Sequence, residues 1–426
     1  MRRGFLLRLA WASALNRRWT LGLTLLAVAT SCALLLGVER LRHDARAGFV
    51  QSVSGTDLIG GARAGSVQLL LYSVFRIGNA SNNIDWRSHQ ALAAHPAVAW
   101  SVPISLGDSH RGYPVLGTTG DYFTHFRHGD DQPLKFARGR AFTGLFEVVV
   151  GAEVARSLGY APDARITLAH GMGAAGALGE AMEHADKPFV VVGVLAPTGT
   201  PVDRTLHVSL ESLSAIHLDW QGGAPIPGLS IPTEHVAKFD LAPKDITATL
   251  LGLKRRADVI RMQRFVGEFR GEPLQAIMPG VALDELWALV GIAERTLLAV
   301  SALVVAVGLA GLVAVVLSSL DQRRRELAVL RSVGARPRDI FVLLAMEGVL
   351  VTGGGIVAGV GLLYAAIALV RPWLLERFGL VIGMHTPSAA EWQLLGMVLA
   401  TGLAASLVPA LRAYRLSLAD GLTPRL

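Results

Sequence analysis

Four apolar runs, and the long gap between the first two, constrain most strongly what this chain can fold into. A helix crossing a hydrocarbon layer of about 30 Å needs about 20 residues, because each residue rises about 1.5 Å. The four runs carry at most one charged residue each and occupy residues 19–38, 296–320, 340–370 and 392–411. No comparable run lies between Glu39 and Arg295. The sequence therefore predicts one membrane span, a large insert and then three spans.

Composition agrees with a membrane protein. Apolar residues make up 52% of the chain and charged residues only 17%, which is unlike an ordinary soluble or disordered protein. The net charge is nevertheless +7, and a basic excess in an apolar chain favours a lipid bilayer over nucleic acid as the partner. Cys32 is the single cysteine, so an intrachain disulfide and a cysteine-based metal cluster are excluded.

The distribution of arginine predicts the orientation. Five arginines precede the first span, six lie in residues 321–339 and three lie in residues 412–426. Such flanks are cytoplasmic, so we expect both termini inside the cell, and the insert (39–295) and the loop at 371–391 outside. Residues 1–18 read as an amphipathic helix on the inner leaflet or as a solvated basic tail. A cleaved signal ending at Cys32 is the alternative to a first span, but its apolar run is normally 7 to 15 residues.

The insert carries both strand and helix patterns and predicts an α+β domain of one or two lobes. We expect strands at 146–151, 165–168, 189–195 and 205–210, helices at 152–158 and 211–217, and loops at 197–201 and 222–232. Residues 246–295 have helical patterning that runs toward the second span, so a stalk helix is expected at the end of the insert. No catalytic motif is visible: none of the five lysines follows a glycine, as a phosphate-binding P-loop requires.

The segment between the second and third spans is the most informative for function. Leu327, Leu330 and Val333 recur on one face of a short helix. Gly334 is placed to end this helix in the left-handed conformation, and Pro337 can start the next one. A short amphipathic helix between two spans can receive force from a soluble partner. The alternative is a basic loop bound to anionic lipid through its exposed arginines, Arg324, Arg325 and Arg331.

This segment resembles the FtsX/MacB-like permease family of ABC transporters. The likeness rests on its arginine-rich start, Glu326, residues 328–331, Gly334-Ala335 and Glu347. The chain end at residues 409–415 and 419–422, and the order of one span, a large insert and three spans, are also similar to the family.

The resemblance implies that residues 322–338 are a coupling helix that docks on a separate ATPase. It also implies an ATPase dimer that holds ATP and magnesium, a second permease chain, identical or different, and the bacterial inner membrane as location. This chain itself is expected to hold no cofactor and to be no enzyme. The ATPase-coupling residues would be Arg324, Arg325, Glu326, Leu327, Leu330, Arg331, Val333 and Gly334.

Two functions stay open for such a permease. The first is to couple ATP hydrolysis to motion of the periplasmic domain, for extraction of lipoproteins or efflux of periplasmic substrates. The other is FtsX-type signalling or scaffolding, in which the chain regulates a periplasmic partner enzyme without transport.

Within the spans, Glu347 is the candidate functional residue, because a carboxylate inside a membrane is costly unless paired. Its position near the span end also permits it to reach the interface or a loop arginine. Gly355 and Gly359 form a GxxxG pair, which predicts close helix packing.

Two groups in the insert have residues of the types that bind zinc-like ions. The first contains Asp121, His125, His128, Asp130 and Asp131, with His125, His128 and Asp130 as the metal candidates. The second contains Glu180, Glu183, His184 and Asp186. Solvated surface residues are the alternative for both.

Overall fold

The computed structural model describes residues 18–415, except 53, 79, 81, 172–183, 222–223, 227, 323–328, 330–331, 333 and 379–382. The chain divides into two compact units. The inserted domain comprises Arg46–Val290, and the helical unit comprises Met1–Ala45 together with Gly291–Leu426.

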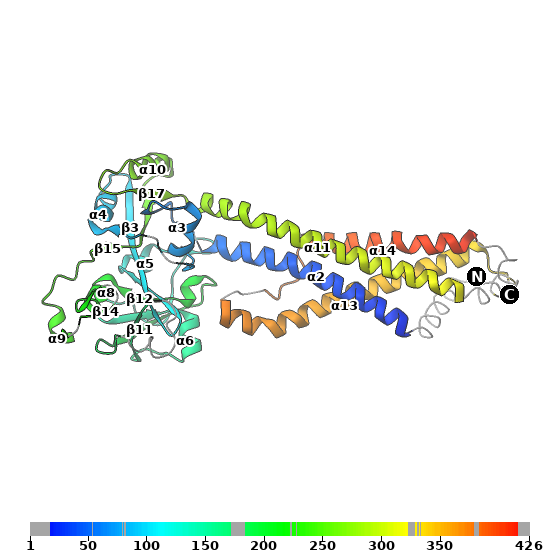
Figure 1. Ribbon diagram of the computed structural model, residues 1–426, viewed down its shortest axis with the longest axis horizontal. Helices are drawn as coiled ribbons and strands as arrows, with labels where there is room; N and C mark the ends of the chain where they lie inside the picture. Colours follow the sequence, from blue (N-terminus) through cyan, green and yellow to red (C-terminus); the bar gives the residue numbers. More distant parts are fainter. Residues whose placement is uncertain are drawn as a thin grey trace. The chain divides into compact units, whose positions relative to one another are not determined.

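Four long helices form the helical unit, and two of them, α2 and α11, also have residues in the inserted domain (Figure 1). They are α2 (Arg18–Gln51), α11 (Pro279–Gln322), α13 (Pro337–Phe378) and α14 (Ala389–Arg415). Each contains a stretch long and apolar enough to cross a membrane: Leu21–Asp44, Pro279–Ser318, Pro337–Trp373 and Ala389–Arg412. The predicted architecture of four membrane helices with a domain between the first and second is therefore confirmed.

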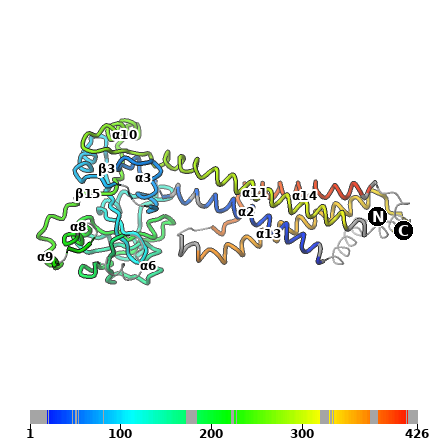
Figure 2. Tube along the Cα trace, in the orientation of Figure 1, coloured from blue at the N-terminus to red at the C-terminus, as the bar shows by residue number. Residues whose placement is uncertain are grey.

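The four helices pack on one another through a shared apolar core. Leu21 of α2, Leu312 of α11, Leu344 of α13 and Ala410 of α14 belong to one buried cluster. Figure 2 shows the same four helices as a trace, running alongside one another. The cluster joins the first span to the last three, although the 257 residues of the insert, 39–295, separate the first predicted span from the second.

A mixed sheet of eleven strands forms the centre of the inserted domain. Its main path is β17 (Leu274–Ile277), β1 (Leu58–Ala62), β16 (Ala248–Leu253), β3 (Val98–His110), β4 (Tyr113–Thr118), β12 (Leu206–Ser209), β8 (Glu147–Val150), β11 (Phe189–Leu195) and β7 (Phe136–Gly139). Off this path, β9 (Arg165–Ile166) pairs with β11, and β10 (Ala169–His170) pairs with β3. The pairs β4–β12 and β8–β11 are parallel, and the others are antiparallel.

The sheet is continuous because the 13-residue β3 pairs with strands in both halves of the sheet (Figure 1). The first half of β3 pairs with β16 and the second half with β4, where the register shifts between Leu106 and Ser109. Buried apolar clusters lie at both ends, around Val102 and Leu251 on one side and around Val148 and Phe189 on the other.

Short helices and three strand pairs complete the domain. The helices are α3 (Ser66–Ser73), α4 (Trp86–Ala93), α5 (Asp121–His125), α6 (Ala152–Leu158), α8 (Leu210–Ile216), α9 (Thr233–Val236) and α10 (Val259–Gly267), with 3-10 turns η1 (Pro201–Arg204) and η2 (Arg256–Asp258). The pairs are β2 (Ile84–Asp85) with β15 (Asp245–Ile246), β5 (Arg127–His128) with β6 (Gln132–Pro133), and β13 (Trp220–Gln221) with β14 (Ala224–Pro225).

The strands and helices predicted between residues 146 and 217 are present as β8, α6, β9, β11, β12 and α8. The helical pattern assigned to residues 246–295 is wrong for its first part. Residues 248–253 and 274–277 are strands, and only α10 and the start of α11 are helical there. The run Ala248–Leu253 is buried along almost its whole length, and a fully buried strand cannot be told from a helix by periodicity.

Candidate functional site

Most of the predicted coupling residues lie outside the described residues. These are Arg324, Arg325, Glu326, Leu327, Leu330, Arg331 and Val333. Gly334 is described and has φ +99°, which agrees with its predicted role as the residue that ends the helix. Helix α13 begins at Pro337 as predicted, and the Asp339 carboxylate accepts a hydrogen bond from the Arg336 backbone N–H at 2.9 Å. The proline and this hydrogen bond together mark the start of α13.

A buried ion pair in the helical unit joins α2 to α14. The Arg40 guanidinium donates two hydrogen bonds to Glu391, from Nε at 2.9 Å and from Nη2 at 3.2 Å, and the two side chains are 1% and 2% exposed. Arg40 also lies 4.9 Å from the centroid of the Tyr364 ring of α13. Buried charges persist only when they are paired and hydrogen-bonded, so this contact fixes three helices relative to one another.

Glu391 is held by its own helix start as well. Its carboxylate accepts a hydrogen bond from the Ser388 backbone N–H at 2.6 Å, and the Ser388 hydroxyl accepts one from the Glu391 backbone N–H at 3.2 Å. This reciprocal arrangement is a capping box. The predicted spans ended at Val38 and began at Trp392, so this pair was not predicted. The signal that could have found it is Ser-x-x-Glu directly before an apolar run.

Further polar contacts surround the same end of α2. Arg42 binds Glu39 and, on α11, Glu294, each at 3.1 Å. Asp44 lies 3.2 Å from His385 and accepts a hydrogen bond from the Gly383 backbone N–H at 2.9 Å. Together with Arg40, these residues connect α2 to α11, to α14 and to the segment before α14.

Glu347 lies inside the helical unit, where it is 3% exposed. It falls on the same face of α13 as Leu344 and Val351, which are buried in the shared core. The adjacent Gly348 is packed so closely that an added Cβ would collide with Ser406 of α14. The carboxyl group of Glu347 therefore faces the other helices and not the surrounding lipid.

The predicted GxxxG pair brings α13 against α2. A Cβ added at Gly359 would lie 2.7 Å from the Ala29 carbonyl oxygen and 2.8 Å from the Cys32 Cβ. One added at Gly355 would lie 2.6 Å from Val28 Cγ1. The two helix backbones approach this closely because glycine has no side chain.

We expect Gly359→Leu to separate α13 from α2 and to destabilise the helical unit by about 1–3 kcal/mol. The new side chain would collide with the Ala29 carbonyl oxygen, a backbone atom that cannot move aside. Gly361→Leu is the matched control, since a Cβ there meets nothing within 4 Å. Thermal unfolding of both variants in the same detergent measures the difference. Equal stability of the two would contradict the packing described here.

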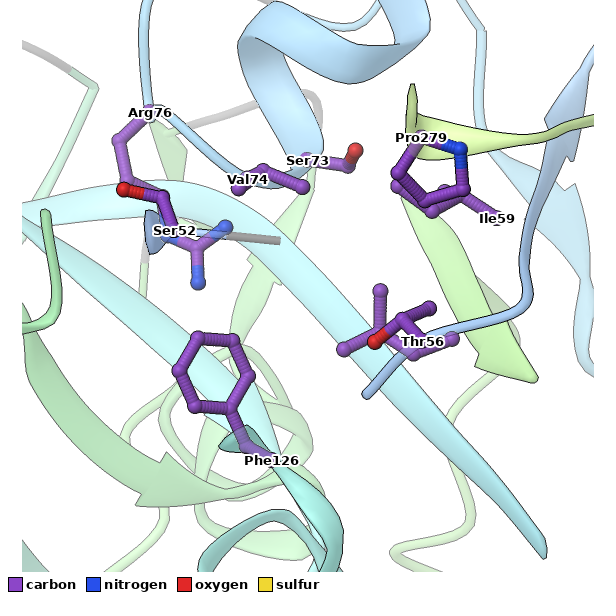
Figure 3. A pocket seen from close by; sticks show the side chains of 9 residues that line it. Ser52, Thr56, Ile59, Ser73, Val74, Arg76, Phe126 and Pro279 are labelled. Carbon is purple, nitrogen blue, oxygen red and sulfur yellow. The ribbon is translucent and has the colours of Figure 1, made fainter. Parts of the chain in front are cut away.

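The core of the inserted domain contains a cavity near the lower limit for one water molecule, about 10 Å³ (Figure 3). Arg76, Ser73 and Phe126 are among its lining residues. Arg76 has φ +59°, an uncommon conformation outside glycine, and burial lowers the pKa of its guanidinium. Burial also raises the pKa of the neighbouring Tyr122 phenol to about 12. The cavity is too small for a transported molecule.

His207 lies close to these groups and is fully buried. Its ring packs 5.2 Å from the Tyr122 ring, and its Nδ1 lies 3.3 Å from the Val149 carbonyl oxygen. Burial, with the positive charge of Arg76, lowers the pKa of His207 to about 3. The imidazole is therefore neutral in the folded protein.

Acidification is expected to destabilise the inserted domain through His207. His207 takes up a proton near pH 6.5 in the unfolded chain but only near pH 3 in the folded chain. The stabilisation that comes from the neutral, buried imidazole is therefore complete above pH 6.5 and is lost as the pH falls toward 3. At pH 5 the loss from this residue is about 2 kcal/mol. Urea unfolding of the full-length protein in detergent at pH 7 and pH 5 measures it. His207→Leu should lose less stability than the wild type over that range, and an equal loss would contradict the assignment.

The possible metal ligands that lie close together in the described part of the structure do not include the predicted candidates His125, His128 and Asp130. His125 stacks on Trp100, with ring centroids 5.0 Å apart. Among the described residues, the group whose ligand atoms lie within 4.8 Å of one another is Asp108, His170 and His217. Burial alone would raise the pKa of Asp108, but the hydrogen bond with His170, and His217 beside it, hold it at about 2. Of the second predicted group, Glu180 and Glu183 lie outside the described residues.

Two family models match the chain. The FtsX-like permease C-terminal model matches residues 298–418, and the MacB-like periplasmic core domain model matches residues 21–231. A relative, the macrolide export ATP-binding/permease protein MacB of Rhodospirillum rubrum, is 29% identical over 196 residues. That alignment covers 45% of this chain and only 28% of the relative.

Two solved structures are also similar. The periplasmic region of MacB from Actinobacillus actinomycetemcomitans shares 11% identity, with a TM-score of 0.33 over 56% of this chain and 95% of that one. The extracellular domain of the noncanonic ABC-type transporter YknZ from Gram-positive bacteria shares 12% identity, with a TM-score of 0.29 over 52% of this chain and 99% of that one.

Four apolar helices with a mixed α/β domain between the first and second define a multi-pass membrane protein with a periplasmic-type domain. The two family matches give the family: one covers the first span and most of the inserted domain, and the other covers the last three helices. The chain belongs to the FtsX/MacB-like permeases of ABC transporters. The resemblance seen in the sequence is thereby confirmed.

Proposed function

We propose that this chain transmits the ATP-driven closure of a partner ATPase to its inserted domain on the outer side of the bacterial inner membrane. The observation that carries the proposal is helix continuity. Helices α2 and α11 are unbroken, and each includes residues of both the helical unit and the inserted domain. A displacement at the inner end of such a helix has a covalent path to the inserted domain.

The coupling segment at residues 322–338 is the proposed docking site for the ATPase. Its apolar face, Leu327, Leu330 and Val333, would enter a groove of the partner, and its arginines would set the orientation. The segment falls within the match to the FtsX-like permease model, which supports this role. The arginine-rich flanks of the spans support a cytoplasmic location for this segment and for both termini.

A mechanical role fits the helical unit better than a channel through it. The four apolar runs of the sequence contain Glu347 as their single charged residue, and that side chain is buried between helices. We therefore propose that substrates are moved on the periplasmic side, as in lipoprotein extraction or in efflux, without passing through the bundle. The relative named as a macrolide exporter supports the efflux variant.

Affinity purification from the native membrane in mild detergent tests the proposal. We expect a stoichiometric ATPase with a P-loop, a second permease chain and magnesium-dependent ATP hydrolysis. An intact, monodisperse protein without any nucleotide-hydrolysing partner would contradict it. Recovery of a periplasmic enzyme activated by the complex, with no bound lipid or peptide, would favour FtsX-type signalling over transport.

A further inference from the structure

Four side chains from distant parts of the sequence meet at one place in the inserted domain, and no role in coupling uses them. Asp108 lies in β3, His170 in β10, His217 directly after α8, and His184 before β11. Asp108 occupies the point where the register of β3 with β4 shifts, and His170 is its register partner on β10. Such irregularities in a strand commonly redirect a side chain toward a site.

The distances at this place suit a shared cation. Asp108 Oδ1 lies 3.0 Å from His170 Nδ1 and 3.5 Å from His217 Nε2. Ligand atoms about 2.0–2.1 Å from a tetrahedral Zn²⁺ are separated by about 3.3 Å. The three residues therefore need only small side-chain movements to bind one ion. His170 and His217 are each about one-third exposed, which leaves a route for its entry.

The hydrogen bonding of His217 orients its Nε2 toward Asp108, 3.5 Å from the Asp108 Oδ1. His217 Nδ1 lies 2.9 Å from the Leu213 carbonyl oxygen, which can only accept, so Nδ1 carries the proton. When the ring is neutral, its Nε2 therefore presents a lone pair to the Asp108 carboxylate, and it makes no hydrogen bond there. In this neutral form the two atoms face each other as the ligands of a metal ion do.

His184 is the second, independent sign of a ligand. It is 0% exposed, and neither of its ring nitrogens has a hydrogen-bond partner among the described residues. Its ring lies edge-to-face with His217 at 5.0 Å and 4.2 Å from the Trp220 ring. A buried imidazole whose nitrogens find no partner among the residues described is costly, and a metal ion would satisfy it.

A buried ion pair holds the His184 segment in place beside the group. Lys187, which is 0% exposed, donates to both carboxylate oxygens of Asp219 at 2.7 and 2.8 Å and to Asp186 at 2.7 Å. Its charge is thus neutralised by two carboxylates and does not oppose a cation nearby. The His184 backbone N–H also donates to the Leu168 carbonyl oxygen at 2.8 Å.

We propose that Asp108, His170 and His217 bind a divalent transition-metal ion of the zinc type, with the buried His184, whose ring nitrogens lie outside that 4.8 Å group, moving closer as the fourth ligand. Three imidazoles and one carboxylate suit such an ion and not Ca²⁺ or Mg²⁺, which prefer oxygen ligands. The ion would tie β3, β10 and the end of α8 together. The site would stabilise this end of the inserted domain, and it does not depend on the coupling role proposed above.

The test uses the full-length protein in detergent, stripped with EDTA and titrated with Zn²⁺ alone. We expect one Zn²⁺ per chain, and binding weakened by more than about 100-fold in His217→Ala and in Asp108→Asn. The matched control is His125→Ala/His128→Ala, which should bind as the wild type does. Absence of stoichiometric binding in the wild type, or equal loss in the control, overturns the proposal.

A second measurement avoids variants that fail to fold. Diethyl pyrocarbonate modifies accessible histidines of the wild-type protein, and mass spectrometry identifies them. We expect Zn²⁺ to protect His170 and His217, which are partly exposed, while His125 reacts equally with and without the ion. Unchanged modification of His170 and His217 in saturating Zn²⁺ overturns the proposal.

Discussion

Leu330→Asp is expected to abolish ATP-driven coupling while leaving the fold intact. The change puts a carboxylate at the centre of the proposed apolar face of Leu327, Leu330 and Val333, and burying it against the ATPase costs about 3 kcal/mol or more, a loss of about 100-fold in affinity. The ATPase should then be lost on purification, and substrate-dependent or lipid-dependent stimulation of hydrolysis should vanish.

Ser332→Asp is the matched control for this variant. Ser332 is exposed. In the predicted helix it would be about 200° from Leu330, so the same charge is added on the face opposite the proposed docking face. We expect ATPase binding and hydrolysis close to those of the wild type. Unchanged coupling in Leu330→Asp, or an equal defect in both variants, would contradict the docking face.

Glu391→Gln is expected to give the largest loss of stability of any single change in the helical unit. It removes the charge that balances Arg40, which is 1% exposed, and breaking a buried ion pair in this way costs about 3–5 kcal/mol. Thermal unfolding in detergent measures the loss. The double variant Arg40→Met/Glu391→Leu should recover much of the stability, because it leaves no buried charge unpaired.

Glu294→Gln provides the control for the buried pair. Glu294 binds Arg42 at 3.1 Å, but the Arg42 side chain is 32% exposed, so its ion pair is worth about 1 kcal/mol or less. A loss in Glu391→Gln no larger than that in Glu294→Gln would show that the Arg40–Glu391 contact does not hold the helices together.

The membrane spans could be predicted from the sequence because the length of an apolar run and its lack of charge are enough to identify a span. A run such as residues 296–320, without charge, has few folds open to it other than a membrane helix. Strand β11 was predicted at its observed bounds, because Phe189–Leu195 is dominated by valine and is followed at once by turn residues. Local patterns were sufficient in both cases.

The remaining features depend on contacts between distant residues. Arg40 and Glu391 lie just beyond the uncharged runs, so a rule based on charge placed them outside the spans. Asp108, His170 and His217 are between 47 and 109 residues apart in sequence, and spacing within one segment cannot reveal such a group. His184 was singled out, but its neighbours in the fold are not those in the sequence.

The most direct test of the central claim is an ATP-dependent distance change between the inserted domain and the helical unit. Spin labels at Arg270→Cys and Ala390→Cys, both exposed positions, can be placed in a Cys32→Ser background. Pulsed electron spin resonance then measures their separation in the complex with a hydrolysis-deficient ATPase. We expect ATP to shift the distance distribution and Leu330→Asp to abolish the shift. An identical distribution with and without ATP, in a complex shown to bind ATP, would contradict the central claim.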